Sequence, residues 1–134
     1  MNLNFRLITP AGIMWAGYAE EVIIPSSTGQ VGILNNHASL LTSLDIGLMR
    51  VKTNDEWFSI VLLEGVTQVE ENAITVVSRE AEEGALIDPF DAKVRLQTIT
   101  KLSKKAVTRK ERIDMTLELR KAKTKLQSTV PFKI

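Results

Sequence analysis

The segment Gly29-Gln-Val-Gly-Ile-Leu-Asn-Asn-His-Ala-Ser-Leu-Leu-Thr-Ser-Leu-Asp-Ile-Gly47 indicates how the N-terminal part of the chain folds. Apolar residues from Val31 to Leu34 and from Leu40 to Leu44 predict two short strands. The intervening Asn35-Asn36-His37 predicts a turn, because asparagine tolerates a left-handed backbone and bonds to its own main chain. A side chain is expected to obstruct the backbone at three glycines, which are Gly29, Gly32 and Gly47. With no nucleophile beside a base and no cluster of metal ligands, the segment predicts a rigid contact surface.

Short apolar runs continue on both sides of this segment. Leu3, Phe5 and Leu7 alternate with polar residues, which is the pattern of a strand with one buried face. Residues 57–63 are nearly all apolar, which suits a strand covered on both faces. Residues 1–78 hold about eight such runs separated by turn signals, and no helical stripe persists among them. The pattern predicts an antiparallel β-sandwich or barrel.

The apolar period becomes helical after residue 87. Asp88 is expected to cap a helix, with Pro89 at its first position and Asp91 near the positive end of its dipole. The packed stripe of this helix is expected at Ala92, Leu96, Ile99, Ser103 and Ala106. A second helix is expected from about Arg109 to Gln127, with a packed stripe at Met115, Leu119, Ala122 and Leu126. Two antiparallel helices joined by a brief turn form a hairpin.

These patterns predict an α+β protein with two domains. Residues 1–87 are expected to form an antiparallel β-sandwich domain, and residues 88–134 a helical hairpin domain. Residues 79–87 are acidic and are expected to be a linker with room for one last edge strand. The stripe of the first helix is thin and rich in small residues, so a close-packed neighbouring helix is expected.

Composition excludes several kinds of site. The chain has no cysteine, which rules out disulfides, thiolate zinc sites and cysteine nucleophiles. Its single histidine, His37, cannot form a triad or a metal site without partners. No apolar run approaches the roughly 20 residues needed to span a bilayer. The first residues have neither a signal-peptide core nor a transit-peptide composition, so the protein is expected to work where it is made. No metal or cofactor is predicted.

The near-neutral net charge hides a strong asymmetry. Residues 1–100 hold six Lys and Arg and thirteen Asp and Glu, a net charge of −7. Residues 101–125 hold ten Lys and Arg and three acids, a net charge of +7. Such polarity predicts two functional ends, of which the basic one meets something acidic.

The opening segment also resembles the signature of the epsilon subunit of F-type ATP synthases. In that family a Gly-x-hydrophobic-Gly-hydrophobic-Leu run leads through a corner ending in Asn-His-Ala to a hydrophobic segment closing in Asp-hydrophobic-Gly. Here these elements are Gly29–Leu34, Asn36–Ala38 and Asp45–Gly47. The family usually has proline before the Asn and after the Ala, where this chain has Asn35 and Ser39.

Further motifs extend the resemblance over nearly the whole chain. Asp55-Glu56-Trp57 resembles the Asn-Asp-Gln-Trp of chloroplast-type epsilon subunits, and Ile87-Asp88-Pro89 opens the first helix in the same way. Residues 119–125 resemble the basic Leu-Arg-Arg-Ala-Arg motif of the second helix. Glu64-Gly65 departs from the usual Gly-Gly. The combination resembles plastid-encoded or cyanobacterial-type subunits more than ordinary bacterial ones.

The resemblance implies a role without catalysis. It implies a central-stalk rotor subunit whose sandwich clamps the gamma subunit and sits on the c-ring, so that proton flow is coupled to ATP synthesis. It also implies that the C-terminal helices reach the catalytic alpha and beta subunits transiently and inhibit ATP hydrolysis. The implied location is the stromal side of the chloroplast thylakoid membrane, as a peripheral protein, or else the cytoplasmic side of a cyanobacterial or bacterial membrane.

Two groups of residues are candidates for these contacts. The resemblance implies that Ser27, Thr28, Gly29, Gln30 and His37 contact the c-ring and gamma, and the plain alternative is that they only close turns. The inhibitory contacts would be made by Arg120, Lys121, Lys123 and Lys125. Four cations this close repel one another unless an acidic partner neutralises them, and the plain alternative is a solvated face.

Nucleotide and nucleic-acid binding are the remaining hypotheses. Some bacterial epsilon subunits bind ATP through hydrophobic-Asp-x-x-Arg-Ala, which would involve Asp88, but here Asp91 replaces the Arg and would repel a phosphate. Gly29-Gln-Val-Gly32 is a weak phosphate-loop signal, because no Lys or Arg lies between Arg6 and Arg50. A nucleic-acid-binding module that uses the basic hairpin is the alternative function, although no aromatic residue is interleaved among its cations. A sandwich enzyme is a third, without any polar constellation to support it.

Overall fold

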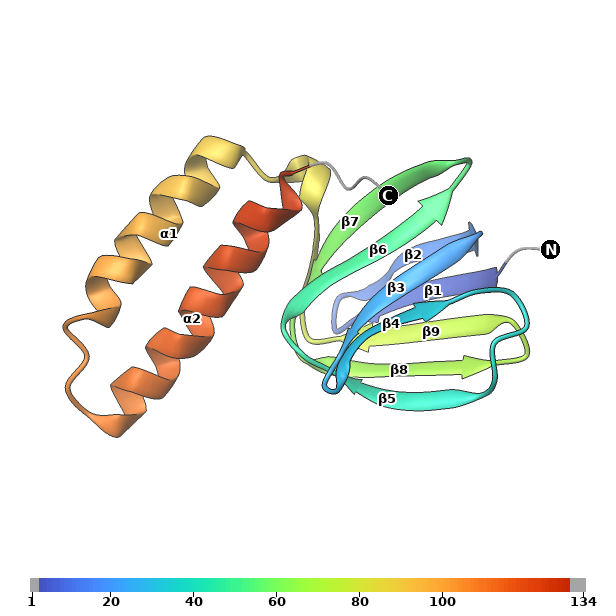
Figure 1. Cartoon of the computed structure of the whole chain (residues 1–134), viewed down its shortest axis with the longest axis horizontal. Helices are drawn as coiled ribbons and strands as arrows, with labels where there is room; N and C mark the ends of the chain where they lie inside the picture. The colour runs from blue at the N-terminus through green and yellow to red at the C-terminus, as the bar shows by residue number, and fades with distance from the viewer. Residues whose placement is uncertain (1–2, 131–134) are drawn as a thin grey trace.

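The computed structural model describes residues 3–130, which form a β-sheet unit followed by two helices (Figure 1). The strands are β1 (Leu3–Thr9), β2 (Gly12–Ala19), β3 (Glu21–Ser26), β4 (Gly29–Ile33), β5 (Leu40–Leu44), β6 (Gly47–Thr53), β7 (Glu56–Leu62), β8 (Gly65–Glu70), β9 (Ala73–Ser78) and β10 (Ala81–Glu83). The helices are the short 3-10 helix η1 (Gly84–Leu86), α1 (Pro89–Ser103) and α2 (Arg109–Ser128). The predicted fold class, a β-sandwich followed by a two-helix hairpin, is confirmed. The domain boundary after residue 87 stays a prediction, and the outer ends of both domains, residues 1–2 and 131–134, lie outside the described residues.

All the described strands belong to one sheet that is folded into two layers. Its order is β10-β7-β6-β3-β5-β8-β9-β1-β2, with β4 paired to β3. β3 and β5 share a single register pair, Ser26 with Leu44, and the two halves of the sheet diverge from this point and face each other (Figure 1). One layer therefore holds β10, β7, β6, β3 and β4, and the other holds β5, β8, β9, β1 and β2. The pairing is antiparallel as predicted, except that β1 runs parallel to β9.

The main core lies between the two layers. Leu3, Phe5 and Leu7 are at most 1% exposed, as their alternation with polar residues predicted. Other fully buried side chains come from both layers and include Ile24, Ile33, Met49, Ile60, Leu62 and Ile74. The rings of Phe5 and Trp15 meet edge to face at 5.5 Å, and those of Trp15 and Phe58 at 6.0 Å. This aromatic chain ties β2 to β7 across the core.

Strand β7 is covered on both faces at its C-terminal end, as predicted. Ile60 and Leu62 belong to the main core cluster. Val61 and Leu63 are equally buried, at 3% and 4% exposure, but are not part of that cluster. Because side chains alternate along a strand, they point to the opposite face. That face is covered by α2, which packs against β6 and β7.

The three glycines of the opening segment have different roles. Gly29 has a φ of +125°, a backbone conformation that a side chain disfavours. A Cβ on Gly47 would lie 2.6 Å from the Cβ of Pro25, so the close approach predicted there is confirmed. The prediction for Gly32 is wrong, because a Cβ at that position would meet open space. Gly32 lies in β4, which is paired on one side only, so it has room.

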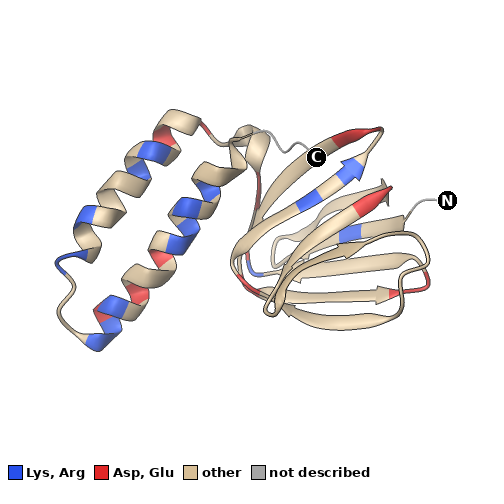
Figure 2. Ribbon diagram, viewed as in Figure 1, with Lys and Arg blue, Asp and Glu red and all other residues tan. Residues whose placement is uncertain are grey.

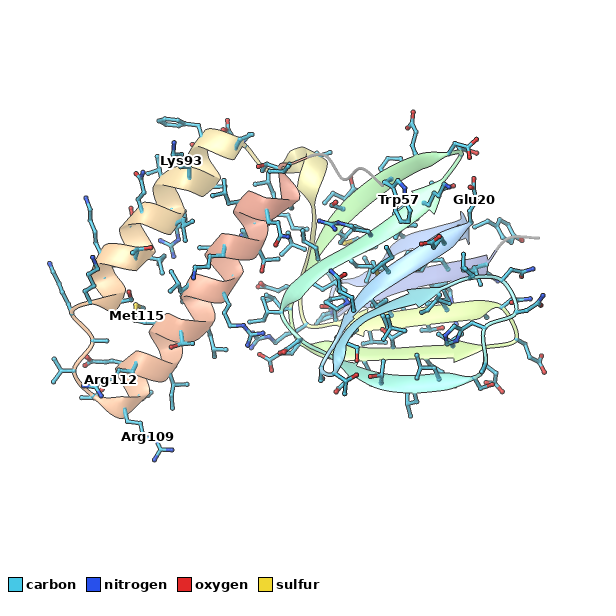
Figure 3. The ribbon with its side chains drawn as sticks, viewed as in Figure 1. Glu20, Trp57, Lys93, Arg109, Arg112 and Met115 are labelled. Carbon is cyan, nitrogen blue, oxygen red and sulfur yellow. The ribbon has the colours of Figure 1, made fainter. Side chains whose placement is uncertain are left out.

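The helical hairpin follows the predicted capping and packing. Asp88 Oδ1 accepts hydrogen bonds from the backbone N–H groups of Phe90 at 2.8 Å and Asp91 at 3.3 Å. The predicted stripe residues are buried or half-buried, namely Ala92, Leu96, Ile99, Ser103 and Ala106 on the first segment and Met115, Leu119, Ala122 and Leu126 on α2. α1 ends at Ser103, so Ala106 lies in the connection. Figure 3 shows Met115 between the two helices.

The start of α2 carries a capping pair that the sequence analysis missed. Thr108 Oγ1 accepts a hydrogen bond from the backbone N–H of Glu111 at 3.1 Å. The Glu111 carboxylate in return accepts from the backbone N–H of Val107 at 3.0 Å. The hydrogen bonds that the Glu111 carboxylate accepts from the backbone, first from Val107 and then from Thr108, lower its pKa below the ordinary value. The Thr-x-x-Glu spacing was the signal available in the sequence.

Candidate interaction surfaces

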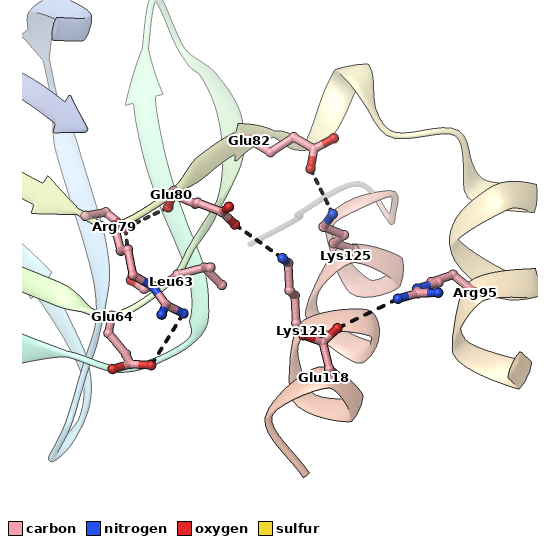
Figure 4. Close-up of polar contacts among 10 residues, drawn as sticks. Leu63, Glu64, Arg79, Glu80, Glu82, Arg95, Glu118, Lys121 and Lys125 are labelled. Carbon is pink, nitrogen blue, oxygen red and sulfur yellow. Dashed lines mark hydrogen bonds and ion pairs between the residues drawn. The ribbon is translucent and has the colours of Figure 1, made fainter. Parts of the chain in front are cut away.

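Three of the four cations predicted to contact a partner are paired with acids of the sandwich. The pairs and their N–O distances are Arg120–Asp45 at 3.1 Å, Lys121–Glu80 at 3.2 Å and Lys125–Glu82 at 3.2 Å. Figure 4 shows the two lysine pairs side by side along α2. Lys123 is exposed and has no ion-pair partner among residues 3–130. The acidic partner inferred from composition is thus supplied, in this structure, by the chain itself.

Helix α2 presents a second packed face, which the sequence analysis also missed. Thr124 and Ser128 are buried, and they follow Lys121 at helical spacing. A Cβ on Gly84 of η1 would lie 2.8 Å from the carbonyl oxygen of Ser128 and 3.1 Å from that of Ser59. The backbone of η1 therefore approaches the C-terminal turn of α2 as closely as a glycine allows. Small residues at positions 124 and 128 were the signal, since they let a helix approach its neighbour.

The surface under α2 is apolar and has an acidic rim. Its apolar members are buried residues outside the main core cluster, namely Ile46, Leu48, Val61 and Leu63. Leu48 and Val61 are register partners in β6 and β7, so they lie side by side. We call these four residues together with Asp45, Glu80 and Glu82 the acid-rimmed patch. A groove of about 550 Å³ lined by Val61, Leu63 and the two lysine pairs remains between the patch and α2.

The ion pairs at this surface are individually weak. The paired side chains are between 29% and 62% exposed. Ion pairs in such a setting contribute about 0–1 kcal/mol each, because water screens them and two long side chains must be held still. Figure 2 shows that the Lys and Arg residues gather on the two helices, whereas the sandwich carries few. The docked position of the hairpin therefore combines apolar packing with a set of charge pairs that salt can weaken.

The residues predicted to contact the c-ring and gamma do not form one surface. Ser27 and Thr28 form the turn between β3 and β4, where Ser26 Oγ bonds Thr28 Oγ1 at 3.1 Å. Gly29 and Gln30 begin β4 next to them and are exposed. His37 follows the other end of β4, in the connection to β5. The length of β4 therefore separates the first four residues from His37.

His37 closes a turn at its end of the sandwich. Its backbone N–H donates to the carbonyl of Leu34 at 3.1 Å, and its Nδ1–H donates to the carbonyl of Ala38 at 2.7 Å. Asn36 before it has a φ of +66°, as the turn chemistry predicted. The N–H of Asn36 donates to Asn72 Oδ1 at 2.6 Å, which joins this connection to the turn between β8 and β9. The local role of His37 is clear, and its contact role stays a prediction.

Asp88 is engaged by its own helix. Both hydrogen bonds to its side chain come from the first turn of α1, which accounts for an aspartate at this position. Nucleotide binding through Asp88 stays a hypothesis. The carboxylate of Asp91, which stands where the nucleotide-binding motif has Arg, would repel a phosphate. Within residues 3–130 no group of three or more His, Asp or Glu is arranged to hold a metal ion.

A further surface, not predicted, lies on the outer face of the second layer. Val66 pairs with Val77, Val77 with Ile8, and Ile8 with Ile13, so four apolar side chains form one row across β8, β9, β1 and β2. Val66 is 45% exposed, Val77 43% and Ile13 62%. We call these four residues the apolar row. An exposed apolar row on a sheet face is a candidate protein contact surface.

No described helix is both long enough and apolar enough to cross a membrane.

Comparison with known proteins gives a consistent family. Residues 2–84 match the beta-sandwich domain of the ATP synthase delta/epsilon chain. The chain is 56% identical over 128 residues to the chloroplastic ATP synthase epsilon chain of Emiliania huxleyi, covering 96% of this chain and 98% of that one. It is 39% identical over 133 residues to the chloroplastic epsilon chain of Pelargonium hortorum, covering 98% and 99%.

Solved structures agree on the fold. A chain of the Euglena gracilis mitochondrial ATP synthase assembly with OSCP, F1 and c-ring superposes with a TM-score of 0.85 at 16% identity, covering 96% of this chain and 82% of that chain. A chain of the Tetrahymena thermophila mitochondrial ATP synthase central stalk and c-ring gives a TM-score of 0.65 at 10% identity, covering 97% and 98%. At these identities the likeness concerns the fold alone. The family match and the close relatives show that the chain belongs to the epsilon chains of the ATP synthase, as a subunit without a catalytic site of its own.

Proposed function

We propose that this epsilon chain is a central-stalk rotor subunit of a chloroplast-type F-type ATP synthase, coupling proton flow through the c-ring to ATP synthesis and inhibiting ATP hydrolysis through its C-terminal helices. The observation that carries the inhibitory part is the docking of α2 on the acid-rimmed patch. It combines a modest apolar contact with three exposed ion pairs, so the hairpin can be released at small cost. An element that is held but releasable suits a brake.

The sandwich suits the coupling role. A subunit that transmits torque must not deform, and here one continuous sheet is closed over a core whose large side chains are fully buried. The single bend at Ser26 and Leu44 is stiffened by the hydrogen bond of Ser26 Oγ with Thr42 Oγ1 at 3.0 Å. The groove beside α2 is lined by two lysine–glutamate pairs in which each charge faces its counter-charge. A rigid body without a reactive site is what a coupling subunit requires.

Three surfaces of the sandwich are candidates for contact with partners within the complex. We assign contact with the c-ring or gamma to Ser27–Gln30 at one end of the sandwich and to His37 at the other, and the apolar row is a third surface for the same assembly. Since the ends are separated by the length of β4, the two ends would meet different subunits or different parts of one subunit.

The location follows from the relatives and the contacts proposed. The close relatives are named as chloroplastic, and this supports a chloroplast protein. Binding to the c-ring from outside the bilayer would make it peripheral, on the stromal side of the thylakoid membrane.

The brake can be tested in the reconstituted enzyme. Lys123→Ala removes a cation that has no ion-pair partner among residues 3–130 while the hairpin is docked, so it is expected to leave docking unchanged and to weaken the proposed contact with acidic groups of the catalytic subunits. Arg120→Ala with Lys123→Ala is expected to weaken inhibition of hydrolysis further, with assembly intact. Lys93→Ala on the exposed face of α1 is the matched control. Unchanged ATP hydrolysis in both Lys123 variants would remove the basis for the inhibitory role.

Co-purification separates this function from the alternative. An epsilon subunit co-purifies with the other ATP synthase subunits, whereas a nucleic-acid-binding module would bind generic DNA in a salt-dependent manner. Three of the four cations in question already face carboxylates of the same chain, which lowers the positive potential that DNA would meet. We therefore expect no DNA binding by the isolated chain.

A further inference from the structure

The ion pairs between α2 and the sandwich follow a regular spacing. Lys121 and Lys125 are four residues apart, which is about 6 Å along a helix. Glu80 and Glu82 are two residues apart where the chain enters β10, which is about 6.6 Å along an extended strand. The two repeats match, and so each lysine reaches its own glutamate at 3.2 Å (Figure 4). Side chains at i and i+4 of a helix thus pair with side chains at j and j+2 of a strand.

The third pair lies on the other flank of the patch. In the sheet order β10-β7-β6, Glu82 lies beyond β7, whereas Asp45 lies in the connection that leads into β6. Arg120 pairs with Asp45 at 3.1 Å, and the three pairs therefore bracket the apolar residues of β6 and β7. Lys123 lies two residues, or about 200°, from both lysines around the helix, which leaves it on the opposite face.

We propose that Asp45, Glu80 and Glu82 act as a charge latch, which holds the hairpin docked by occupying the same cations that the brake would offer to the catalytic subunits. This inference rests on the proposed function. Each of these cations lies 3.1–3.2 Å from a carboxylate of the sandwich, which offsets its charge and reduces the attraction that a partner's carboxylates would exert on it while the hairpin is docked. Docking therefore opposes braking, and the sandwich acids set the balance between them.

The latch predicts a measurable opening. Each exposed pair shifts the docking equilibrium by a factor of about 1.5 to 5. Glu80→Gln with Glu82→Gln removes both lysine pairs without changing side-chain size, and the ratio of undocked to docked hairpin is expected to rise about 2- to 25-fold. Salt weakens exposed pairs, since the Debye length falls from about 10 Å at 0.1 M to about 3 Å at 1 M. The wild type should therefore open as salt rises, and the double variant should respond less.

The experiment uses the full-length chain with two spin labels. The chain has no cysteine, so Gln97→Cys on α1 and Gln68→Cys on β8, both at exposed positions, give two unique labels. The label–label distance distribution reports the docked fraction. Glu64→Gln is the matched control, because Glu64 pairs with Arg79 of the sandwich at 3.7 Å and not with the hairpin. Opening in the double variant but not in the control supports the latch.

A charge exchange tests the specific pairing. Glu80→Lys places two cations together and should open the hairpin, and adding Lys121→Glu should close it again. If the docked fraction of the glutamine double variant equals that of wild type, and the exchange fails to close the hairpin, the latch is overturned.

Hydrolysis by the reconstituted complex then separates the two proposals. If ATP hydrolysis is inhibited more strongly with the Glu80→Gln, Glu82→Gln variant than with wild type, both the charge latch and the inhibitory role of the hairpin are supported. If the hairpin opens in the isolated chain while hydrolysis is unchanged, the latch stands and the brake is wrong.

Discussion

The backbone of η1 closely approaches the last turn of α2 at Gly84, and this contact allows a steric test that leaves every charge in place. A Cβ at this position would lie 2.8 Å from the carbonyl oxygen of Ser128, 3.1 Å from the Cβ of Ser128 and 3.1 Å from the carbonyl oxygen of Ser59. Two of these atoms belong to the backbone and cannot swing aside. In Gly84→Ala either η1 or the last turn of α2 must therefore move.

Gly84→Ala changes two free energies, one in the docked hairpin and one in the unfolded chain. Overpacking of this kind costs about 1–3 kcal/mol. Gly84 does not have a positive φ, so alanine fits its backbone conformation and regains about 0.4–1 kcal/mol by restricting the unfolded chain. Undocking the hairpin relieves the two contacts with Ser128 but not the contact with Ser59 of β7, so the docked state bears most of the steric cost. The gain of alanine belongs to the unfolded chain and is the same for docked and undocked hairpins, so the docking equilibrium itself should shift by about 1–3 kcal/mol, a factor of roughly 5–150.

The spin-label pair at positions 68 and 97 measures this shift directly. Urea unfolding followed by tryptophan fluorescence reports the sandwich separately, and its midpoint should change little. Gly32→Ala is the matched control, because its Cβ enters open space and its φ is ordinary. Ser128→Gly added to Gly84→Ala removes one of the three close contacts and should recover part of the docking. A docked fraction in Gly84→Ala equal to that of Gly32→Ala would refute the steric reasoning.

Two further predictions concern the sandwich and the hairpin turn. In Gly65→Ala the new Cβ would lie 1.9 Å from the carbonyl oxygen of Val77, so we expect a loss of sandwich stability at or above the upper end of the overpacking range, about 3 kcal/mol, read as a lower urea midpoint. The pKa of Glu111 is lowered by the backbone hydrogen bonds it accepts, so its contribution to the α2 cap is complete above its ordinary pKa of 4.5 and is lost as pH falls through the lowered value. An NMR titration of the Glu111 carboxyl checks the direction, and in Glu111→Gln the first turn of α2 should lose this pH dependence; a Glu111 pKa at or above 4.5 would contradict the assignment.

Local chemistry made much of this fold predictable. The alternation of Leu3, Phe5 and Leu7 with polar residues predicted a strand with one buried face. The continuous apolar run at the end of β7 predicted a strand that is covered on both faces. Asp88 before Pro89 fixed the start of α1 to the residue, because a capping side chain and a preset φ act within one turn. Such signals depend only on neighbours along the chain, and a single sequence contains them.

Long-range pairing was not predictable in the same way. The parallel alignment of β1 with β9 joins residues about seventy positions apart, and nothing in either strand specifies its partner. Ser27 and His37 are separated because β4 lies between them. The composition of the two loops does not indicate the length and direction of that strand. The apolar row was missed because Val66 and Val77 look like ordinary strand residues until the register aligns them.

The cations of α2 show that charge patterning alone does not give the position of the acidic groups that the cations meet. Residues 120–125 indicated an acidic partner, but charge patterning does not reveal whether that partner is another subunit or the chain itself. Glu80 and Glu82 looked like part of an acidic linker. Only the match between helix and strand repeats reveals that these two acidic residues face Lys121 and Lys125.

The arrangement of surfaces separates the proposed coupling contacts from the proposed brake. The hairpin docks on the outer face of β6 and β7, whereas the apolar row lies on the outer face of the opposite layer. A hairpin that leaves its patch therefore uncovers no part of the row and disturbs no side chain between the layers, since Val61 and Leu63 are not members of the main core cluster. Under the proposed function, the sandwich would stay attached to the rotor through one face while the other face holds or releases α2. The proposed brake would then change state without loosening the body proposed to transmit the torque.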